Sequence, residues 1–279
     1  MLNMIKADFY RIFKGKSIYI ALIILLSLIS LSCFTMSPGH IGIVATDDTS
    51  DVVYDEELNQ KLSDTNSIIE TRRLVKEYGS YPIDKLQLGA NINLYYFFII
   101  IVAIVLVTDL STSTAKNTLS SAISRKRYYA SKLITCLLLG TGLILINNYV
   151  SYFLNLIMNG SKFSSGILEI TKLTLLQLPI LYGIISLLVC LGFCFKKSAN
   201  FNSITIPLII LIQLIIMGIA SLFHFDASQL LNYELQYILA NLVTNPTTAY
   251  LIKTTLLGLI YIVGFTTIGY TVFKKSEIK

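Results

Sequence analysis

Long apolar runs separated by short polar segments dominate the chain. A helix needs about 20 mostly apolar residues to cross the hydrocarbon core of a bilayer. Six runs meet this requirement and predict membrane-spanning helices over residues 17–36, 88–107, 133–158, 173–195, 204–223 and 251–273. The third run is long enough to tilt or to extend past the membrane. The pattern therefore predicts an all-α polytopic membrane protein.

The segment before the first run, residues 1–16, has a different pattern. Its apolar residues recur at helical spacing and leave Lys6 and Arg11 off the apolar stripe; they are Leu2, Ile5, Phe9, Ile12 and Phe13. This spacing predicts an amphipathic helix that lies in the cytoplasmic interface and turns at Gly15 into the first span. A plain N-terminal extension of that span is the alternative. A cleaved signal peptide is disfavoured because the apolar run exceeds the usual length.

Two further segments lie between spans. Residues 37–87 form the largest polar segment, which begins acidic and turn-rich and then predicts a helical stretch over about 54–78. We interpret it as an extracellular loop or small helical domain. Residues 224–250 contain an apolar stretch that Asp226 can cap and that runs to about Val243. This stretch predicts one extracellular helix that is re-entrant or lies on the surface.

The composition supports a membrane location. Hydrophobic residues make up 54% of the chain and charged residues 14%, whereas soluble domains carry about 25% charged residues. This balance excludes an ordinary cytosolic enzyme, a disordered protein and a coiled coil.

The distribution of charge predicts the orientation. The N-terminus, the loops at 108–132 and 196–203, and the tail at 274–279 together carry 14 of the 22 Lys and Arg residues but three of the 16 acidic residues. The positive-inside rule then predicts that both termini are cytoplasmic. The positive net charge of +6 is thus explained by topology, and a nucleic-acid partner is not expected.

Candidate catalytic chemistry is sparse. The two histidines, His40 and His224, are far apart in the sequence, and neither an H-E-x-x-H motif nor a G-x-x-x-x-G-K-[ST] motif occurs. We expect no metal site, no catalytic residue and no nucleotide site in this chain. The four cysteines lie in the predicted spans, so a disulfide framework is not expected.

The predicted spans carry no Asp or Glu deep in their apolar runs, which disfavours an ion-coupled carrier. The polar groups that remain there are amides, and these are the candidates for a substrate path: Asn93, Asn147, Asn148, Asn155, Gln177 and Gln213. The alternative is that these amides hold helices together by hydrogen bonds.

The loop after the second span carries the most specific motif. It reads DLSTSTAKNTLSSAISRKRYYASKLI from Asp109 to Ile134 and is short and basic, and its helical spacing places Leu119 and Ile123 on one face. It resembles the first cytoplasmic loop of type-2 ABC-transporter permeases, in which a coupling helix docks on a separate ATP-binding subunit. The N-terminal amphipathic helix, the six spans and the apolar helix before the last span agree with that family. The resemblance implies coupling roles for Lys116, Thr118, Leu119, Ser121, Ile123, Arg125, Lys126 and Arg127.

The resemblance implies a permease subunit of an ATP-driven exporter in a bacterial cell membrane. Its expected partners are an ABC ATP-binding subunit, which would hold ATP and Mg, a second permease copy or a sister permease, and the lipid bilayer. Because the chain is short and its first external loop is sizeable, it looks most like exporters of peptides such as bacteriocins, lantibiotics or amphipathic toxins, including those that confer immunity. Two alternatives remain open: a type-2 permease for lipid, drug or ion, and a non-transport sensor or assembly module that uses the 37–87 segment.

Overall fold

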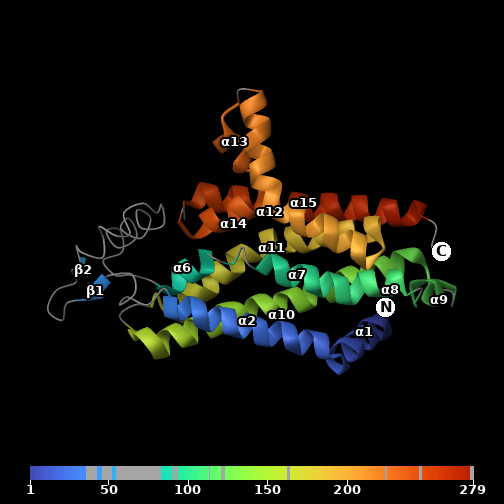
Figure 1. The fold of residues 1–279 in the computed structure, drawn as a ribbon, viewed down its shortest axis with the longest axis horizontal. Helices are drawn as coiled ribbons and strands as arrows, with labels where there is room; N and C mark the ends of the chain where they lie inside the picture. The colour runs from blue at the N-terminus through green and yellow to red at the C-terminus, as the bar shows by residue number, and fades with distance from the viewer. Residues whose placement is uncertain are drawn as a thin grey trace. The chain divides into compact units, whose positions relative to one another are not determined.

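The computed structural model describes residues 1–35, 43–45, 52–54, 83–89, 91, 94–112, 114–120, 123–161, 164–223, 225–244 and 247–276. These residues are almost entirely helical (Figure 1). Six helical stretches are long and apolar enough to cross a membrane: Lys16–Thr35, Leu94–Ser111, Arg125–Asn159, Ile167–Phe195, Ser198–Leu222 and Thr248–Lys275. The predicted all-helical, six-span class is therefore confirmed, and the chain has the helices of a multi-pass membrane protein.

Helix α1 (Leu2–Lys14) precedes the first long helix, α2 (Lys16–Thr35), and Gly15 lies between them with an extended backbone. The predicted turn at Gly15 is confirmed. The backbone N–H of Gly15 donates to the carbonyls of Arg11 and Ile12, both at 3.1 Å, and so closes the end of α1.

The second span differs from its predicted start. Leu88 belongs to a separate short helix, α6 (Ile83–Gly89), and the spanning stretch begins at Leu94. Between them, the Asn91 side chain donates to Gln177 Oε1 at 2.8 Å. Asn side chains often compete with helical backbone bonding. The span itself consists of α7 (Leu94–Val102), the π-helical turn η2 (Ala103–Val107) and α8 (Thr108–Ser111).

The other long helices extend beyond the predicted apolar runs. They are α10 (Arg125–Asn159), α11 (Ile167–Phe195), α12 (Ser198–Leu222) and α15 (Thr248–Lys275). The predicted loop over 196–203 is therefore wrong for most of its length, because α12 begins at Ser198. The turn consists of Lys196 and Lys197, and Lys196 has a φ of 44°.

The structure also differs from prediction in the polar segments. Strands β1 (Ile43–Ala45) and β2 (Val52–Tyr54) pair antiparallel with Ile43 opposite Tyr54, so the helical stretch does not begin at Tyr54. The rest of that predicted stretch, like the acidic residues between and after the strands, lies outside the described residues.

The single helix predicted after Asp226 is two helices, α13 (Ala227–Leu231) and α14 (Leu235–Thr244). Glu234 interrupts the run because its carboxylate caps α14. Oε1 accepts the backbone N–H of Gln236 at 2.9 Å, and Oε2 accepts that of Tyr237 at 2.7 Å. This is the geometry of an N-cap, which satisfies backbone donors that a helix leaves free at its start.

Chain contacts divide the molecule into two compact units. Unit 1 comprises Met1–Leu22, Asn91–Ile144 and Leu176–Lys279. Its interior includes an aromatic group in which the Phe193 ring lies 4.8 Å from that of Tyr129 and 4.6 Å from that of Phe273. Gly258 of α15 packs directly on the backbone of Pro179 in α11.

Unit 2 comprises Ile23–Ala90 and Leu145–Leu175. Asp84 of α6 accepts hydrogen bonds from the hydroxyls of Ser164 and Ser165, both at 2.9 Å. Lys85 forms an ion pair with Glu169 at 2.5 Å. These contacts join α6 to the segment that starts α11.

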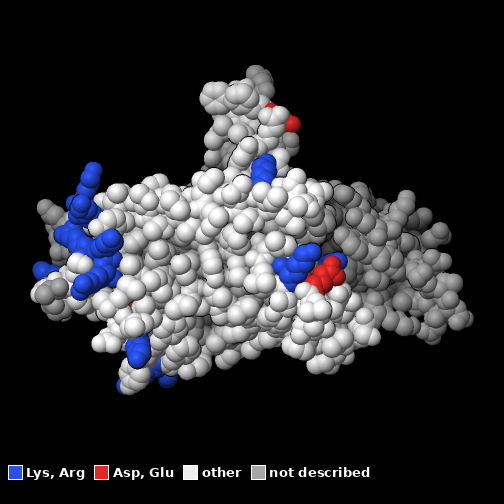
Figure 2. Space-filling view, turned by 180° about the vertical axis from the view of Figure 1, so that it is seen from behind, with Lys and Arg blue, Asp and Glu red and all other residues white. Residues whose placement is uncertain are grey.

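Large apolar side chains lie exposed along several long helices, for example Ile23, Leu214 and Val263 at 64%, 62% and 65% exposure. In Figure 2 most of the described surface on the face shown carries no charged side chain. Such a surface suits contact with lipid chains or with another apolar helix rather than with water.

Candidate functional site

Helix α1 presents one face to the protein, and that face includes a charge. Ile5, Asp8 and Ile12 are buried on it at 8%, 7% and 3% exposure, whereas Leu2 and Phe13 are 71% and 49% exposed. The predicted apolar stripe is therefore split between protein contact and the outer surface. Asp8 occupies a position at helical spacing between the two buried isoleucines.

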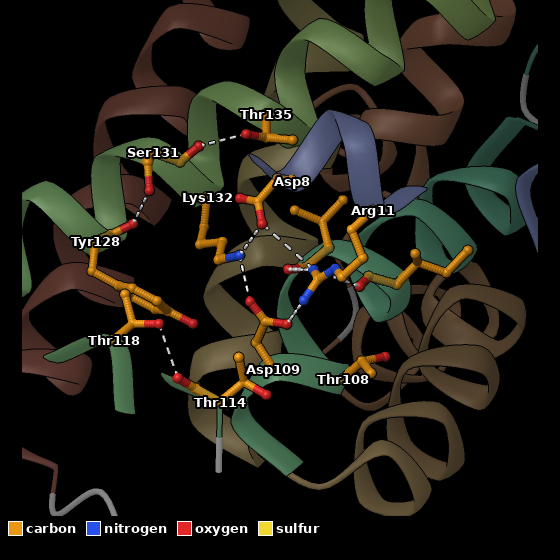
Figure 3. A network of polar contacts seen from close by, with 12 residues as sticks. Asp8, Arg11, Thr108, Asp109, Thr114, Thr118, Tyr128, Ser131, Lys132 and Thr135 are labelled. Atoms are coloured by element: carbon orange, nitrogen blue, oxygen red, sulfur yellow. Dashed lines mark hydrogen bonds and ion pairs between the residues drawn. The ribbon is translucent and has the colours of Figure 1, made fainter. Parts of the chain in front are cut away.

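Asp8 belongs to a group of four charged residues, which we call the charge cluster: Asp8 and Arg11 of α1, Asp109 of α8 and Lys132 of α10 (Figure 3). The Lys132 ammonium lies 2.7 Å from Asp8 Oδ1 and 2.5 Å from Asp109 Oδ2. The Arg11 guanidinium pairs with Asp109 and lies 3.5 Å from Asp8 Oδ1. Each cation thus bridges both carboxylates, and three helices meet at the cluster.

Arg11 also contacts the π-helical turn. Its Nη2 donates to the carbonyls of Ile104 and Val105 at 3.5 and 3.4 Å, and the Thr108 hydroxyl donates to the carbonyl of Ala103 at 2.8 Å. A π-helical turn shifts the backbone bonding pattern by one residue, and such turns are frequent at functional sites. Here α1 packs against η2, and Arg11 joins the two elements.

The cluster is balanced in charge and largely shielded from water. Lys132, Asp109 and Asp8 are 2%, 3% and 7% exposed, and the Arg11 side chain is 40% exposed. Burial raises the pKa of Asp8 above its usual value, and the nearby Lys132 ammonium opposes that rise. Removing one partner from a buried ion pair costs about 3–5 kcal/mol, because the remaining charge has no compensation.

Helix α9 (Thr114–Ser120) follows the cluster in the chain and contains three of the predicted coupling residues. Lys116 is exposed, and Thr118 and Leu119 are half-buried. Ala115 is fully buried and attaches the helix to the protein. A helix therefore forms within the predicted coupling loop.

The predicted shared face of Leu119 and Ile123 is wrong. Helix α9 ends at Ser120, and Ile123 lies in the irregular link before α10. Ser121 lies outside the described residues.

Three predicted coupling residues open α10. Arg125 turns toward the end of α15: its Nη1 donates to the carbonyls of Phe273, Lys274 and Ser276 at 3.2, 2.7 and 2.9 Å. Arg125 is therefore engaged within its own chain, while Lys126 and Arg127 are exposed. The last carbonyls of a helix lack partners within it, so Arg125 caps α15.

The predicted substrate-path amides have separate hydrogen-bond partners. Asn148 Nδ2 donates to Thr174 Oγ1 at 3.0 Å and Asn147 Nδ2 to Asn148 Oδ1 at 3.1 Å, in unit 2. Asn155 Oδ1 accepts from Asn159 at 2.8 Å. The contact of Asn148 with Thr174 joins α10 to α11 and fits the alternative of helix-joining hydrogen bonds, whereas the other two contacts lie within α10.

The two glutamines of the predicted path belong to unit 1. Gln177 accepts from Asn91, and Gln213 Nε2 lies 3.4 Å from Glu234 Oε2. Asn93 lies outside the described residues. The path stays a prediction, and Gln213 lies beside the carboxylate of Glu234.

The charge cluster is not among the sites predicted from the sequence. Its signal was present in part: Asp8 interrupts an apolar stripe, and Asp109 and Lys132 lie at the ends of adjacent apolar runs with opposite charges. Comparison with protein-family models, with curated proteins and with solved structures gives no match for this chain.

Proposed function

We propose that this chain is the permease subunit of an ATP-driven type-2 ABC exporter, with α9 as the coupling helix. One observation supports the proposal best. Helix α9 lies between the second and third spans, and a residue on each side of it is held by ion pairs. Asp109 and Lys132, on either side of α9, belong to the charge cluster. A force applied to α9 therefore reaches α1, α8 and α10 together.

The proposed partner is an ABC ATP-binding subunit that hydrolyses ATP with Mg, and this chain itself has no catalytic role. A second copy or a sister permease completes the transporter. The proposed substrate is a peptide, such as a bacteriocin, a lantibiotic or an amphipathic toxin, that is exported from a bacterial cell. In this arrangement, closure of the ATPase pushes α9, and Arg125 carries the movement to the end of α15.

Leu119 is the residue of α9 best suited to test the coupling role. It is apolar and half-buried at the end of the helix, and burying one leucine contributes about 1.5–3 kcal/mol to association. We expect Leu119→Asp to reduce the recovery of the ATP-binding subunit with the tagged chain by at least about tenfold. Membrane insertion stays intact because the change lies outside the spans.

The measurement is the ATPase activity that co-purifies with the tagged chain from native membranes after cross-linking. Asn3→Asp is the control, because Asn3 is exposed and lies in α1, outside both α9 and the spans. The proposal is wrong if the unaltered chain carries no ATP-binding subunit. The role of α9 alone is wrong if Leu119→Asp retains the subunit and its activity.

A further inference from the structure

A cavity of about 300 Å³ lies within unit 1 where α14 approaches the long helices. Its lining is mostly apolar and includes Leu191 of α11 and both Ile212 and Ile216 of α12. This volume lies at the small end of the range for ligand-binding cavities. It suits the apolar side chains of a ligand better than a complete large molecule.

Among the described lining residues, Glu234 is the one charged side chain. It is 8% exposed and accepts hydrogen bonds from the backbone of Gln236 and Tyr237 and, at 3.4 Å, from Gln213 Nε2. A carboxylate has about four acceptor positions, so one remains for a ligand. No ion pair joins Glu234 to a cation in the described part of the chain.

Aromatic rings from three elements also line the cavity: those of Tyr95, Tyr233 and Tyr261. The Lys253 ammonium lies 4.8 Å from the centre of the Tyr233 ring, so this ring already has a cation of the chain itself, and the rings of Tyr95 and Tyr261 remain for a ligand. The Tyr261 hydroxyl donates to the Tyr233 carbonyl at 2.6 Å and holds the link before α14 in place. Tyrosine faces attract ammonium groups within about 6 Å.

We propose that this cavity binds a cationic amphipathic peptide, with an apolar side chain inside it and a lysine-type ammonium against Glu234. The charge of the lining selects this occupant. A phospholipid amine is accompanied by a phosphate, whereas a lysine carries no anion. The described lining contains no Lys or Arg to pair with that phosphate, since Lys253 lies against the Tyr233 ring outside the lining. The inference rests on the proposed export function for its role, but its test needs no ATPase.

The chain contains no tryptophan, so a single Tyr233→Trp change creates a unique fluorescent reporter at the cavity. The purified full chain is placed in nanodiscs of zwitterionic lipid. The probe is a short synthetic peptide of Lys and Leu that carries one brominated apolar residue, because bromine quenches tryptophan at contact. We expect saturable quenching by this peptide and none by the same peptide with Glu in place of Lys.

Two further changes test the cavity itself. Glu234→Gln keeps a capping oxygen but removes the charge, and we expect it to weaken the affinity for the Lys peptide by at least about tenfold. Ile216→Phe fills the cavity without touching Glu234, and it should weaken binding of the same peptide. The control reporter is Leu214→Trp, which lies on α12 but outside the cavity lining. Quenching of this tryptophan by the brominated peptide should not saturate and should not change with Glu234→Gln.

Three results would overturn the proposal. The first is equal quenching at the two tryptophan reporters, and the second is a peptide affinity that neither Glu234→Gln nor Ile216→Phe changes. The third is stronger quenching of Tyr233→Trp than of Leu214→Trp by brominated phosphatidylethanolamine, which would identify a lipid as the occupant. If the quenching experiment fails but the ATP-binding subunit still co-purifies, the peptide site is wrong and the permease proposal stands. If the peptide binds but no ATP-binding subunit co-purifies, the chain is a peptide-binding membrane protein without an ATP-driven motor.

Discussion

Lys132 is the residue on which the charge cluster depends most. Its ammonium contacts Asp8 and Asp109 while the residue is only 2% exposed, and it lies 5.5 Å from the centre of the Tyr128 ring. Arg11 contacts the same two carboxylates, but its side chain is 40% exposed.

We expect Lys132→Met to lower the free energy of unfolding by about 3–5 kcal/mol, because it leaves two buried carboxylates with only Arg11 between them. Lys126→Met is the control on the same helix, since Lys126 is exposed and should change stability by about 0.5 kcal/mol or less. Denaturant titration of the purified chain in detergent measures both. Equal midpoints for the two variants would contradict a structural role for the cluster.

Glu234 predicts a specific dependence of stability on pH. Burial raises the pKa of Glu234 above its ordinary value of 4.5, against the hydrogen bonds from Gln236 and Tyr237. The folded chain therefore binds this proton more readily than the unfolded chain, and the free energy of unfolding falls as the pH rises from 4.5 through the raised pKa.

Glu234→Gln removes this titration. We therefore compare the melting temperatures of the unaltered chain and the variant. The stability advantage of the unaltered chain over the variant should become smaller as the pH rises from 4.5 through the raised pKa of Glu234. Melting curves between pH 4 and pH 7 provide the measurement, and a difference that stays constant across the range would show that Glu234 does not titrate there.

At the scale of elements, α11 and α15 approach closely because Gly258 has no side chain. A Cβ at Gly258 would lie 2.7 Å from the carbonyl carbon of Pro179 and 2.8 Å from its oxygen. Both atoms belong to the backbone, so one of the helices must move to admit even a methyl group.

We expect Gly258→Ala to destabilise the chain by about 1–3 kcal/mol through this overpacking. Gly264, further along the same helix, is the matched control because a Cβ there meets nothing within 4 Å. Gly264→Ala should be neutral or stabilising by up to about 1 kcal/mol, since alanine favours a helix over glycine. Thermal unfolding in one detergent compares them, and similar losses at both sites would refute the close approach.

The apolar pattern of the sequence predicts where the long helices lie better than where they begin and end. Apolar runs located all six spans, because helices of soluble proteins rarely contain an apolar run long enough to cross a bilayer. The same runs misplaced helix ends, because α10 begins at Arg125 in a basic segment after Ser124, whose hydroxyl accepts the Arg127 N–H at 3.4 Å. The break at Glu234 was missed for a similar reason: a side-chain cap, not a change in hydrophobicity, separates α13 from α14.

At the scale of the whole molecule, the orientation predicted from charge awaits a direct test. Cys33, Cys136 and Cys190 are buried and Cys194 is exposed, so Cys194→Ser gives a low background for labelling. Cysteines introduced at Ser50 and Ser80 should react with a membrane-impermeant thiol reagent on intact cells, and one at Ser276 should react only after lysis. Protection at the first two positions with labelling at Ser276 would reverse the topology.

The candidate site was harder to predict than the fold because its contacts are distant in the sequence. Arg11 and Asp109 are 98 residues apart, and Asp8 and Lys132 are 124 residues apart. Local periodicity places each residue on its helix face, but nothing local identifies its partner. The prediction that Leu119 and Ile123 share a helix face was wrong for another reason: it assumed that the helix continues past Ser120, where α9 ends.

The separation of the cluster residues has a consequence for how the molecule is made. Asp8 and Arg11 leave the ribosome long before their partners: at about 5–20 residues per second, Lys132 follows Asp8 by roughly 6–25 s. During that interval Asp8 and Arg11 have only each other as partners within α1, and the helix lacks the contacts that hold it against η2. The cluster closes only when α8 and the start of α10 have both been made, so α1 reaches its final position later than its place in the chain would suggest.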